Sequence, residues 1–576
     1  MGSLPGTFAA IPLAASLIAL GPVDLAIIVI YFLFVIGIGV YLKRFANTGH
    51  DFFMAGREMT AWIAGLSFIS ANLGALELLG WAGSAYQYGL LAVHWYWIGA
   101  IPAMLFLGVV MMPFYYVCKT HSVPGYLELR YGPHTRSLAA ICFAAMTILI
   151  SGVNMFAMAI VMQVVLGWNL HLSIWVSSLT VALYVGSGGL LSAIFNEVLQ
   201  FMLIWLGALL VPILGLYQAG GWSGMVRRIE HHVAHGASYV HAWSTLGHFS
   251  ANPMGINWIG IVFGLGAILS MGYWTTDFLV VQRVMAAKDL RSAKMAPIIG
   301  AAFKMFVPFI VILPGLLGLA LLPMKLYPQT YVQAHASAAL FSYNDVLPLM
   351  LVRYCGPGLL GLGVTALIAG FMSGMAGNIS AFATVWTYDI YRPLIRAQAS
   401  DSHYVAMGRW CTVLGVLISI ATAYVAMHFQ SIMDYVQALF SFFIAPLFGT
   451  VVLGMLWKRA TRAGGFWGLL AGTTSSIAMY LWVKFDPAAL KYIALSRQAK
   501  PMAEDMFRAL WCFLIGVAVT VLVSLATRPA AAAQLQGLVW GHTAIPSERD
   551  YPLLHRPIFW AALIFAGLVV LNIIFW

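Results

Sequence analysis

The sequence predicts an all-α polytopic membrane protein with about fourteen transmembrane helices. Of the 576 residues, 62% are hydrophobic and only 8% are charged. A soluble globular domain carries about 25% charged residues, so this chain lacks the polar groups that a water-facing surface requires. Apolar runs of roughly 20 residues, the length that crosses a bilayer, also recur along the whole chain.

Charged or Gly/Pro-rich gaps separate these apolar runs, and no long polar stretch leaves room for a soluble domain. We therefore expect one membrane domain. The predicted spans lie near residues 22–42, 59–86, 88–117, 137–166, 170–187, 192–218, 254–282, 295–323, 357–386, 405–428, 432–457, 464–484, 509–527 and 558–576.

The distribution of basic residues orients these spans. If the N-terminus lies outside, 19 of the 29 Lys and Arg residues fall on the inner side and nine on the outer side. Cytoplasmic loops of membrane proteins carry an excess of Lys and Arg. The bias therefore predicts a multi-pass protein of the cell (inner) membrane with both termini outside.

Charge and cysteine patterns argue against other classes of protein. The net charge of +11 comes from basic residues scattered over short loops, so no nucleic-acid partner is expected. The spacing of the five cysteines predicts neither a metal knuckle nor a disulfide framework. In the predicted outer loop, His231 and His235 have the spacing of a helical metal-ligand pair. Only Glu230 lies nearby, so we favour a solvated, amphipathic loop.

Ionisable side chains inside a span are costly and usually face a cavity or a partner. Glu77 lies midway along the second span, Lys304 in the eighth, Asp277 in the seventh, and Glu197 begins the sixth. A structural ion pair is the alternative interpretation for Glu77 and Lys304. Asp277 and Glu197 lie nearer the inner side, where either could cap a helix or pair with Arg283.

Small polar residues interrupt two of the apolar runs. Such residues often mark close helix packing. At mid-membrane depth, however, amide and hydroxyl groups favour a site, because unwound backbone there offers free carbonyls to ions and solutes. We therefore expect interrupted helices in the second span, at Asn72 and Gly74, and in the ninth, at Gly370, Ser373, Gly374, Gly377 and Asn378.

Six motifs together carry a family resemblance, and their order and spacing are more specific than any one of them. They are residues 52–57, residues 70–80 together with the nearby Gly83-Ser84, Gly188-Gly189 with Glu197 and Gln200, Gln282-Arg283 with 286–288, 387–391, and 457–459. Over about residues 22–530, the chain thereby resembles the sodium/solute symporter family, and in particular its sugar-transporting (sodium/glucose and sodium/galactose) branch.

This resemblance implies a LeuT-like core, made of two inverted five-helix repeats with broken helices. An N-terminal segment with an extra helix would occupy residues 1–58, and the first repeat residues 59–218. An outer loop (219–253) would precede the second repeat (254–484), and further helices would fill residues 485–576.

The resemblance also implies a sugar site, whose residues carry over position by position as Asn72, Glu77, Tyr96, Tyr273, Lys304 and Gln437. Amides, a phenol and an ammonium group suit a solute with several hydroxyls. The ring of Tyr273 could gate the pocket by covering one face of the solute. Sugar symporters usually have a neutral or imidazole side chain at the position of Glu77 and a glutamate at that of Tyr96. In this chain the carboxylate therefore lies at position 77 rather than at position 96, on the opposite wall of the implied pocket. This difference leaves the identity of the sugar open.

The family's sodium site uses three backbone carbonyls, which would belong to Ser70, Leu73 and Gly370, and the hydroxyls of two consecutive serines. This chain has Ser373 followed by Gly374, so one oxygen ligand is missing from the Na+ site. A hard cation prefers oxygen and should bind more weakly without it. A water, or the amide of Asn378 one turn further on, is the candidate substitute.

These features predict a secondary active transporter that couples a cation, in the first place Na+, to symport of a small polar solute, in the first place a monosaccharide. Glu77, Asp277 and Glu197 are the candidates for coupling or gating. Glu77 could instead carry a proton, so proton-coupled and uncoupled transport are the alternatives. An integral-membrane enzyme or a channel is not expected, because no catalytic constellation, charge ring or filter sequence is visible. We expect a monomer in the lipid bilayer.

Overall fold

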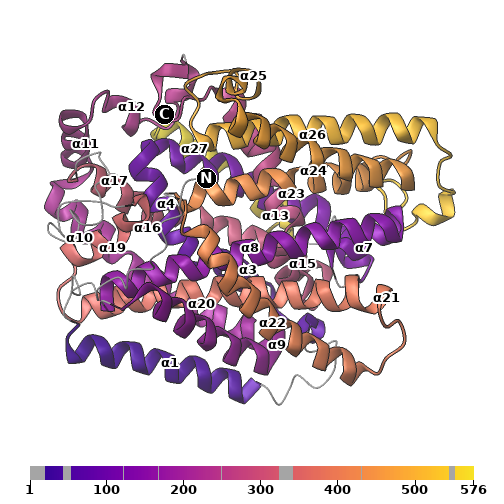
Figure 1. Cartoon of the computed structure of the whole chain (residues 1–576), viewed down its shortest axis with the longest axis horizontal. Coiled ribbons are helices and arrows are strands. Elements are labelled where there is room, and N and C mark those ends of the chain that lie inside the picture. Colours follow the sequence, from indigo (N-terminus) through magenta and orange to yellow (C-terminus); the bar gives the residue numbers. More distant parts are fainter. Residues whose placement is uncertain are drawn as a thin grey trace, which may run out of the picture.

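Helices supply the regular structure of the part of the chain that the structure describes, residues 20–42, 53–120, 122–166, 168–247, 249–322, 342–429, 431–543 and 552–576. The structure is a computed structural model (Figure 1). Within these ranges, an isolated bridge between Met59 and Ala287 is the sole strand-like pairing. The predicted all-α fold class is confirmed.

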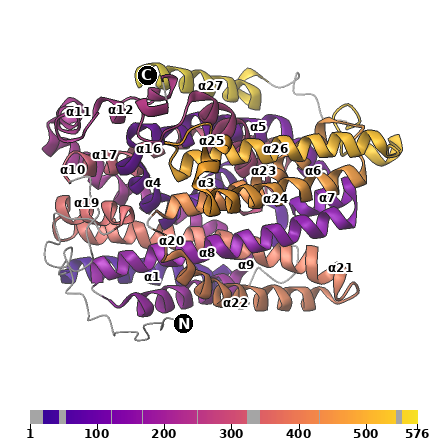
Figure 2. The same cartoon turned by 45° about the horizontal axis from the view of Figure 1, so that its top comes forward.

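Most long helices run roughly parallel to one another (Figures 1 and 2). They are α1 (Pro22–Leu42), α8 (Pro133–Leu166), α9 (Leu170–Ala208), α20 (Leu359–Val385), α22 (Asp401–Ala426), α23 (Ile432–Leu456), α24 (Arg462–Phe485), α26 (Pro501–Ala526) and α27 (Pro557–Ile574). Shorter helices complete the bundle: α3 (Ala61–Asn72), α4 (Ala75–Tyr88), α7 (Val123–Tyr131), α10 (Leu210–Ala219), α13 (Met271–Thr276), α14 (Phe278–Met285), α15 (Leu290–Lys304), α16 (Val307–Val311), α17 (Leu313–Leu319) and α19 (Val346–Tyr354). Two further stretches, Trp95–Val117 and Gly260–Ser270, contain π-helical turns.

Within the described ranges, nine helices are long and apolar enough to cross a membrane, and three bent pairs raise the number to twelve if each pair is one span. The other two predicted spans, 464–484 and 170–187, are helical as well, in α24 and the first part of α9. The backbone of α9 is helical from Leu170 to Ala208, across the gap predicted near residue 190. The count of fourteen, the inverted repeat and the domain boundaries stay predictions.

Three of the spans are bent, and at two of the bends the local residues show how the helix ends. The chain turns by 57° between α3 and α4, by 51° between α13 and α14, and by 47° between α15 and the pair α16–α17. At the first bend, Leu73 leaves the helical conformation and Gly74 is extended. At the second, Asp277 is extended and its carboxylate accepts a hydrogen bond from the N–H of Leu279 (2.9 Å). Asp277 therefore starts a new helix as an N-cap.

The predicted interruption of the second span is thus confirmed, and that of the ninth span is wrong. Helix α20 is continuous from Leu359 to Val385. Its small residues allow close packing instead: a Cβ at Gly377 would lie 3.3 Å from Leu279, and one at Gly370 would lie 3.0 Å from the carbonyl oxygen of Leu73. Gly370 therefore lets α20 approach the broken span while remaining helical itself.

Helices α24 and α26 lie side by side in both views (Figures 1 and 2). A Cβ at Gly468 would collide with the hydroxyl of Thr520, and one at Gly464 with that of Ser524. Close packing of this kind requires small residues along the interface. The same small and hydroxyl-bearing residues make α24 less apolar than α23 and α26.

The predicted outer loop is partly helical, with α11 (Gly221–His232) and α12 (Ala237–Val240). In α11, Met225 and Ile229 are buried while most of the other side chains remain accessible, which agrees with the expected amphipathic segment. No group of three or more metal-ligating side chains occurs among the described residues, His231 and His235 included. His248, a further histidine of the predicted outer loop, lies outside the described residues.

The C-terminal end packs on this loop. The imidazole of His241 contacts the carbonyl oxygen of Trp576 (3.1 Å), and the indole N–H of Trp243 donates to Asn572 (3.2 Å). The loop and the C-terminus therefore lie on one side of the molecule. That this is the outer side stays a prediction.

Asp24 ties α1 to the start of α20, and its loss is expected to destabilise the fold. Its buried carboxylate accepts hydrogen bonds from the N–H groups of Gly358 and Gly361 (2.7 Å each), which have no partner within α20. Asp24→Ala leaves these groups unsatisfied and should lower the free energy of unfolding by about 1–3 kcal/mol. Denaturant unfolding of the detergent-solubilised protein measures this, with the half-exposed Leu25→Ala as control. Equal losses in both variants would contradict this role of Asp24.

Candidate functional site

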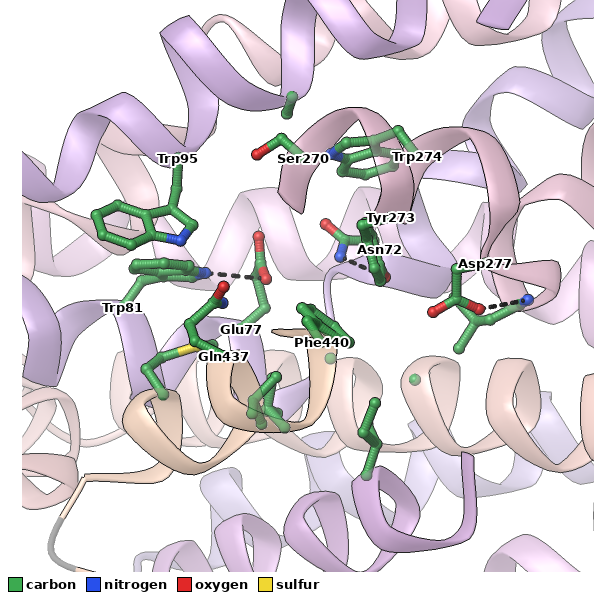
Figure 3. A pocket seen from close by; sticks show the side chains of 18 of the residues that line it. Asn72, Glu77, Trp81, Trp95, Ser270, Tyr273, Trp274, Asp277, Gln437 and Phe440 are labelled. Carbon is green, nitrogen blue, oxygen red and sulfur yellow. Dashed lines mark hydrogen bonds between the residues drawn. The ribbon is translucent and has the colours of Figure 1, made fainter. Parts of the chain in front are cut away.

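A cavity lies at the bends of α3–α4 and α13–α14, between these helices and α8, α15, α20 and α23. All six predicted solute residues line it, as do Asp277, Gly374 and Asn378. Figure 3 shows Trp81, Trp95, Ser270, Trp274 and Phe440 around the same space. Further lining residues include Gly74, Asn154, Met433 and Val436.

The Glu77 carboxylate is the centre of a hydrogen-bond network in this cavity. Its Oε1 accepts hydrogen bonds from the Tyr96 hydroxyl (2.8 Å) and from the Lys304 ammonium (2.9 Å). Its Oε2 accepts one from the Trp81 indole N–H (3.1 Å), from one helical turn further along α4. Glu77 is only 6% exposed, so these three donors replace the water that a carboxylate otherwise needs.

Lys304 extends the network to the end of α3. Its Nζ also donates to the amide oxygen of Asn72, and the Asn72 amide N–H donates to the Tyr273 hydroxyl (3.0 Å). The ammonium also lies 4.9 Å from the ring centre of Tyr96 and 5.1 Å from that of Trp274, within the range of cation–π attraction. The network therefore joins five helical segments around one ion pair.

Aromatic rings and one amide form the rest of the wall. Trp81 and Trp95 pack with their ring centres 4.9 Å apart, and Tyr273 packs against Phe440 at 4.9 Å. Gln437 lies in α23 beside Glu77 and Trp81 (Figure 3). The cavity thus combines flat apolar faces with hydrogen-bonding groups, the composition typical of a small-molecule site.

The four residues predicted to bind Na+ converge where α3 ends against α20. The Ser373 hydroxyl donates to the backbone carbonyl of Ser70 (2.8 Å) and lies 3.1 Å from the Ser70 hydroxyl. The carbonyl of Leu73 faces Gly370. Oxygen atoms of this kind are the ligands that a small hard cation prefers. The Ser70 carbonyl also accepts a hydrogen bond from the Leu73 N–H (2.9 Å), and Gly370 lies within the continuous helix α20. The role of the four residues as ligands stays a prediction.

The other two predicted coupling residues occupy different places. Asp277 lines the cavity and caps α14, as described above. Glu197 is fully buried in α9 outside the cavity lining, where its carboxylate pairs with the guanidinium of Arg283 (2.6 Å) and accepts a hydrogen bond from Ser67. Arg283 also donates to Ser380 of α20 (3.3 Å). This Glu197–Arg283 cluster, completed by Ser67 and Ser380, joins four helices.

Sequence reasoning missed several residues of the cavity wall, namely Trp81, Trp95, Asn154, Ser270, Trp274 and Phe440. Trp81 follows Glu77 by four residues, the spacing of one helical face, and this pattern could have found it. Trp95 and Trp274 adjoin the predicted Tyr96 and Tyr273. Ser270 and Asn154 are polar residues within apolar runs, the signal that identified Glu77.

Several relatives cover most of this chain. It is 29% identical to human "Sodium/glucose cotransporter 4" over 542 residues, covering 91% of this chain and 79% of the relative. It is 29% identical to rabbit (Oryctolagus cuniculus) "Sodium/myo-inositol cotransporter 2" over 547 residues, with the same two coverages. The zebrafish (Danio rerio) "Sodium/glucose cotransporter 4" is 28% identical over 543 residues, covering 91% of this chain and 82% of the relative.

A solved structure described as the substrate-bound outward-open state of a Na+-coupled sialic acid symporter shares the fold. It matches 89% of this chain and 99% of its own with a TM-score of 0.71, at 18% sequence identity. The family and the relatives are transporters rather than enzymes. The family model described as "Sodium:solute symporter family" matches residues 52–472. The predicted resemblance is confirmed, and the chain belongs to the sodium:solute symporter family.

Proposed function

We propose that this protein is a secondary active transporter that couples inward movement of Na+ to uptake of a monosaccharide or a similar cyclic polyol. The observation that carries this proposal is the Glu77–Lys304 network, which presents hydrogen-bonding groups beside aromatic faces in one buried cavity. The sodium/glucose and sodium/myo-inositol relatives support the same class of solute.

The chemistry of the wall matches a ring that carries hydroxyls. Lys304 and the amides of Asn72 and Gln437 offer donors, while Glu77 and the two amide oxygens offer acceptors. A sugar hydroxyl both donates and accepts, so it can join such a mixed set. Trp81 and Phe440 can cover the apolar faces of the ring.

The charges of the cavity, Lys304 against the carboxylates of Glu77 and Asp277, disfavour an anionic solute. Lys304 is the sole Lys or Arg among the described lining residues, and Glu77 neutralises it at 2.9 Å. A carboxylate or phosphate solute would require a cation without such a partner. A neutral polyol can bind the network without separating the pair.

The ion and the solute would share one structural element. Asn72, a solute residue, lies between Ser70 and Leu73, whose carbonyls are the proposed Na+ ligands. Na+ bound there would hold the end of α3 in one conformation and would thereby fix the Asn72 amide toward the cavity. Binding of the ion and of the solute would then favour the same state, which is what coupling requires.

The Glu197–Arg283 cluster is the candidate barrier to release on the inner side. Glu197 and Arg283 are both fully buried, and with Ser67 and Ser380 they join α9, α14, α3 and α20. In alternating access these helices would separate after solute binding, so that ion and solute leave to the inside. Glu197 would then act in gating rather than in solute binding.

Transport by proteoliposomes tests the proposed coupling. We expect labelled glucose, galactose or myo-inositol to accumulate against its gradient only when an inward Na+ gradient is imposed. Uptake that ignores Na+ but follows a pH step would contradict Na+ coupling and support the proton-coupled alternative. Glu77→Gln separates the two further, since a proton-coupled carrier should then lose accumulation while keeping exchange.

Lys304 variants test the solute site. Lys304→Met removes a charged hydrogen-bond donor, which is worth about 1.5–3 kcal/mol, and should raise the solute concentration for half-maximal uptake by roughly 10- to 100-fold. It also leaves Glu77 buried without its cation and should lower thermal stability. Phe306→Leu, at an exposed position two residues away, is the control.

The double variant Glu77→Gln/Lys304→Met distinguishes solute binding from a purely structural pair. It removes both charges, so stability should largely return while solute affinity stays low. Recovery of affinity together with stability would show that the pair serves only the fold.

A further inference from the structure

Asn154 of α8 reaches the broken span from a third helix. Its side chain is buried, lines the cavity and belongs to a helix outside the predicted Na+ ligand set. Its amide oxygen lies 3.4 Å from the N–H of Leu76, in the first turn of α4. The same oxygen would lie 3.0 Å from a Cβ placed on Gly74.

The Asn154 amide also adjoins the position where the family's second serine is missing. A Cβ on Gly374 would lie 3.5 Å from Asn154 Oδ1 and 3.6 Å from Nδ2. It would also lie 3.1 Å from the Cα of Gly74, closer than most side chains tolerate. Helix α20 therefore approaches the break so closely that a side chain at position 374 would require the backbone of Gly74 to shift. The Asn154 amide lies beside the space that a serine hydroxyl at position 374 would enter.

We propose that the Asn154 amide oxygen supplies the Na+ ligand that Gly374 cannot. This inference rests on the Na+ coupling proposed above and adds a residue to its ion site. With the carbonyls of Ser70, Leu73 and Gly370 and the hydroxyl of Ser373, Asn154 Oδ1 completes an all-oxygen set. An amide oxygen is a hard ligand of the kind such cations prefer.

A helix cap is the competing role for Asn154. Gly74 has no side chain to cap α4, and Asn154 Oδ1 accepts the Leu76 N–H instead. A carbonyl-type oxygen has two lone pairs, so it can accept this hydrogen bond and still face an ion. The two roles differ in their dependence on Na+. Loss of a cap lowers stability equally at every Na+ concentration, whereas loss of a ligand shifts the Na+ concentration that stabilises the protein.

Thermal unfolding of the purified protein across a NaCl series, with choline chloride holding ionic strength constant, measures that concentration directly. For Asn154→Ala, we expect half-maximal stabilisation to require about tenfold more Na+ or more, in the range that loss of a group around a bound metal costs. In Asn154→Ala/Gly374→Ser the new hydroxyl gains the space of the Asn154 amide, while its Cβ requires the Gly74 backbone to shift by a few tenths of an ångström. Much of the wild-type Na+ dependence should then return. Ser151→Ala, a buried polar change one turn away on α8, should leave it unchanged.

Asn154→Asp keeps the size of the side chain and an oxygen, so it covers the case in which the alanine variant does not fold. It should bind Na+ at least as tightly as the wild type does. Unchanged Na+ dependence in Asn154→Ala, or a shift caused by Asn378→Ala in its place, would overturn the assignment to Asn154. A wild-type protein that Na+ does not stabilise would overturn the proposed coupling itself and this inference with it.

Discussion

The break between α3 and α4 is the feature on which the rest of the site depends. An intact helix satisfies its own carbonyls, and a bilayer offers no water to satisfy those that a break sets free. The break is tolerated here because two helices close over it: α20 brings the Ser373 hydroxyl to the Ser70 carbonyl, and α8 brings the Asn154 amide to the Leu76 N–H. These partners are polar groups that an ion can replace or share. The break therefore serves both the fold and the proposed ion site.

Two buried ion pairs occupy different parts of the same bundle. Glu77–Lys304 faces the cavity, whereas Glu197–Arg283 lies outside it and joins α9 to α14. Buried pairs contribute little net stability, because removing two charges from water costs about as much as their attraction returns. Both pairs have further hydrogen-bond partners, from Tyr96, Trp81 and Asn72 in the first case and from Ser67 and Ser380 in the second. Such pairs can change partners when helices move, which suits a protein that alternates between two states.

The parts of the site visible in the sequence are polar groups within apolar runs. Asn72, Glu77 and Lys304 stood out on this ground, and the structure places them in hydrogen-bond contact. Trp81, Trp95 and Phe440 could not be found in this way, because an aromatic residue in a membrane span looks the same whether it faces lipid, a neighbouring helix or a cavity. The glycines of α20 misled for a related reason: glycine allows both a helix break and a close helix contact. The structure shows that α20 stays intact and that Gly370 and Gly377 serve close contacts with Leu73 and Leu279.

The central claim is that ion and solute bind to one shared break, and reciprocal linkage tests it most directly. Equilibrium binding of Na+ would be measured with and without saturating sugar, and binding of sugar with and without saturating Na+, in wild-type protein and in Asn72→Ala. If the break is shared, each ligand raises the affinity of the other by the same factor, as thermodynamic linkage requires, and the factor falls toward one in Asn72→Ala. Affinities that do not depend on the other ligand in the wild type, or linkage that Asn72→Ala leaves intact, would contradict it.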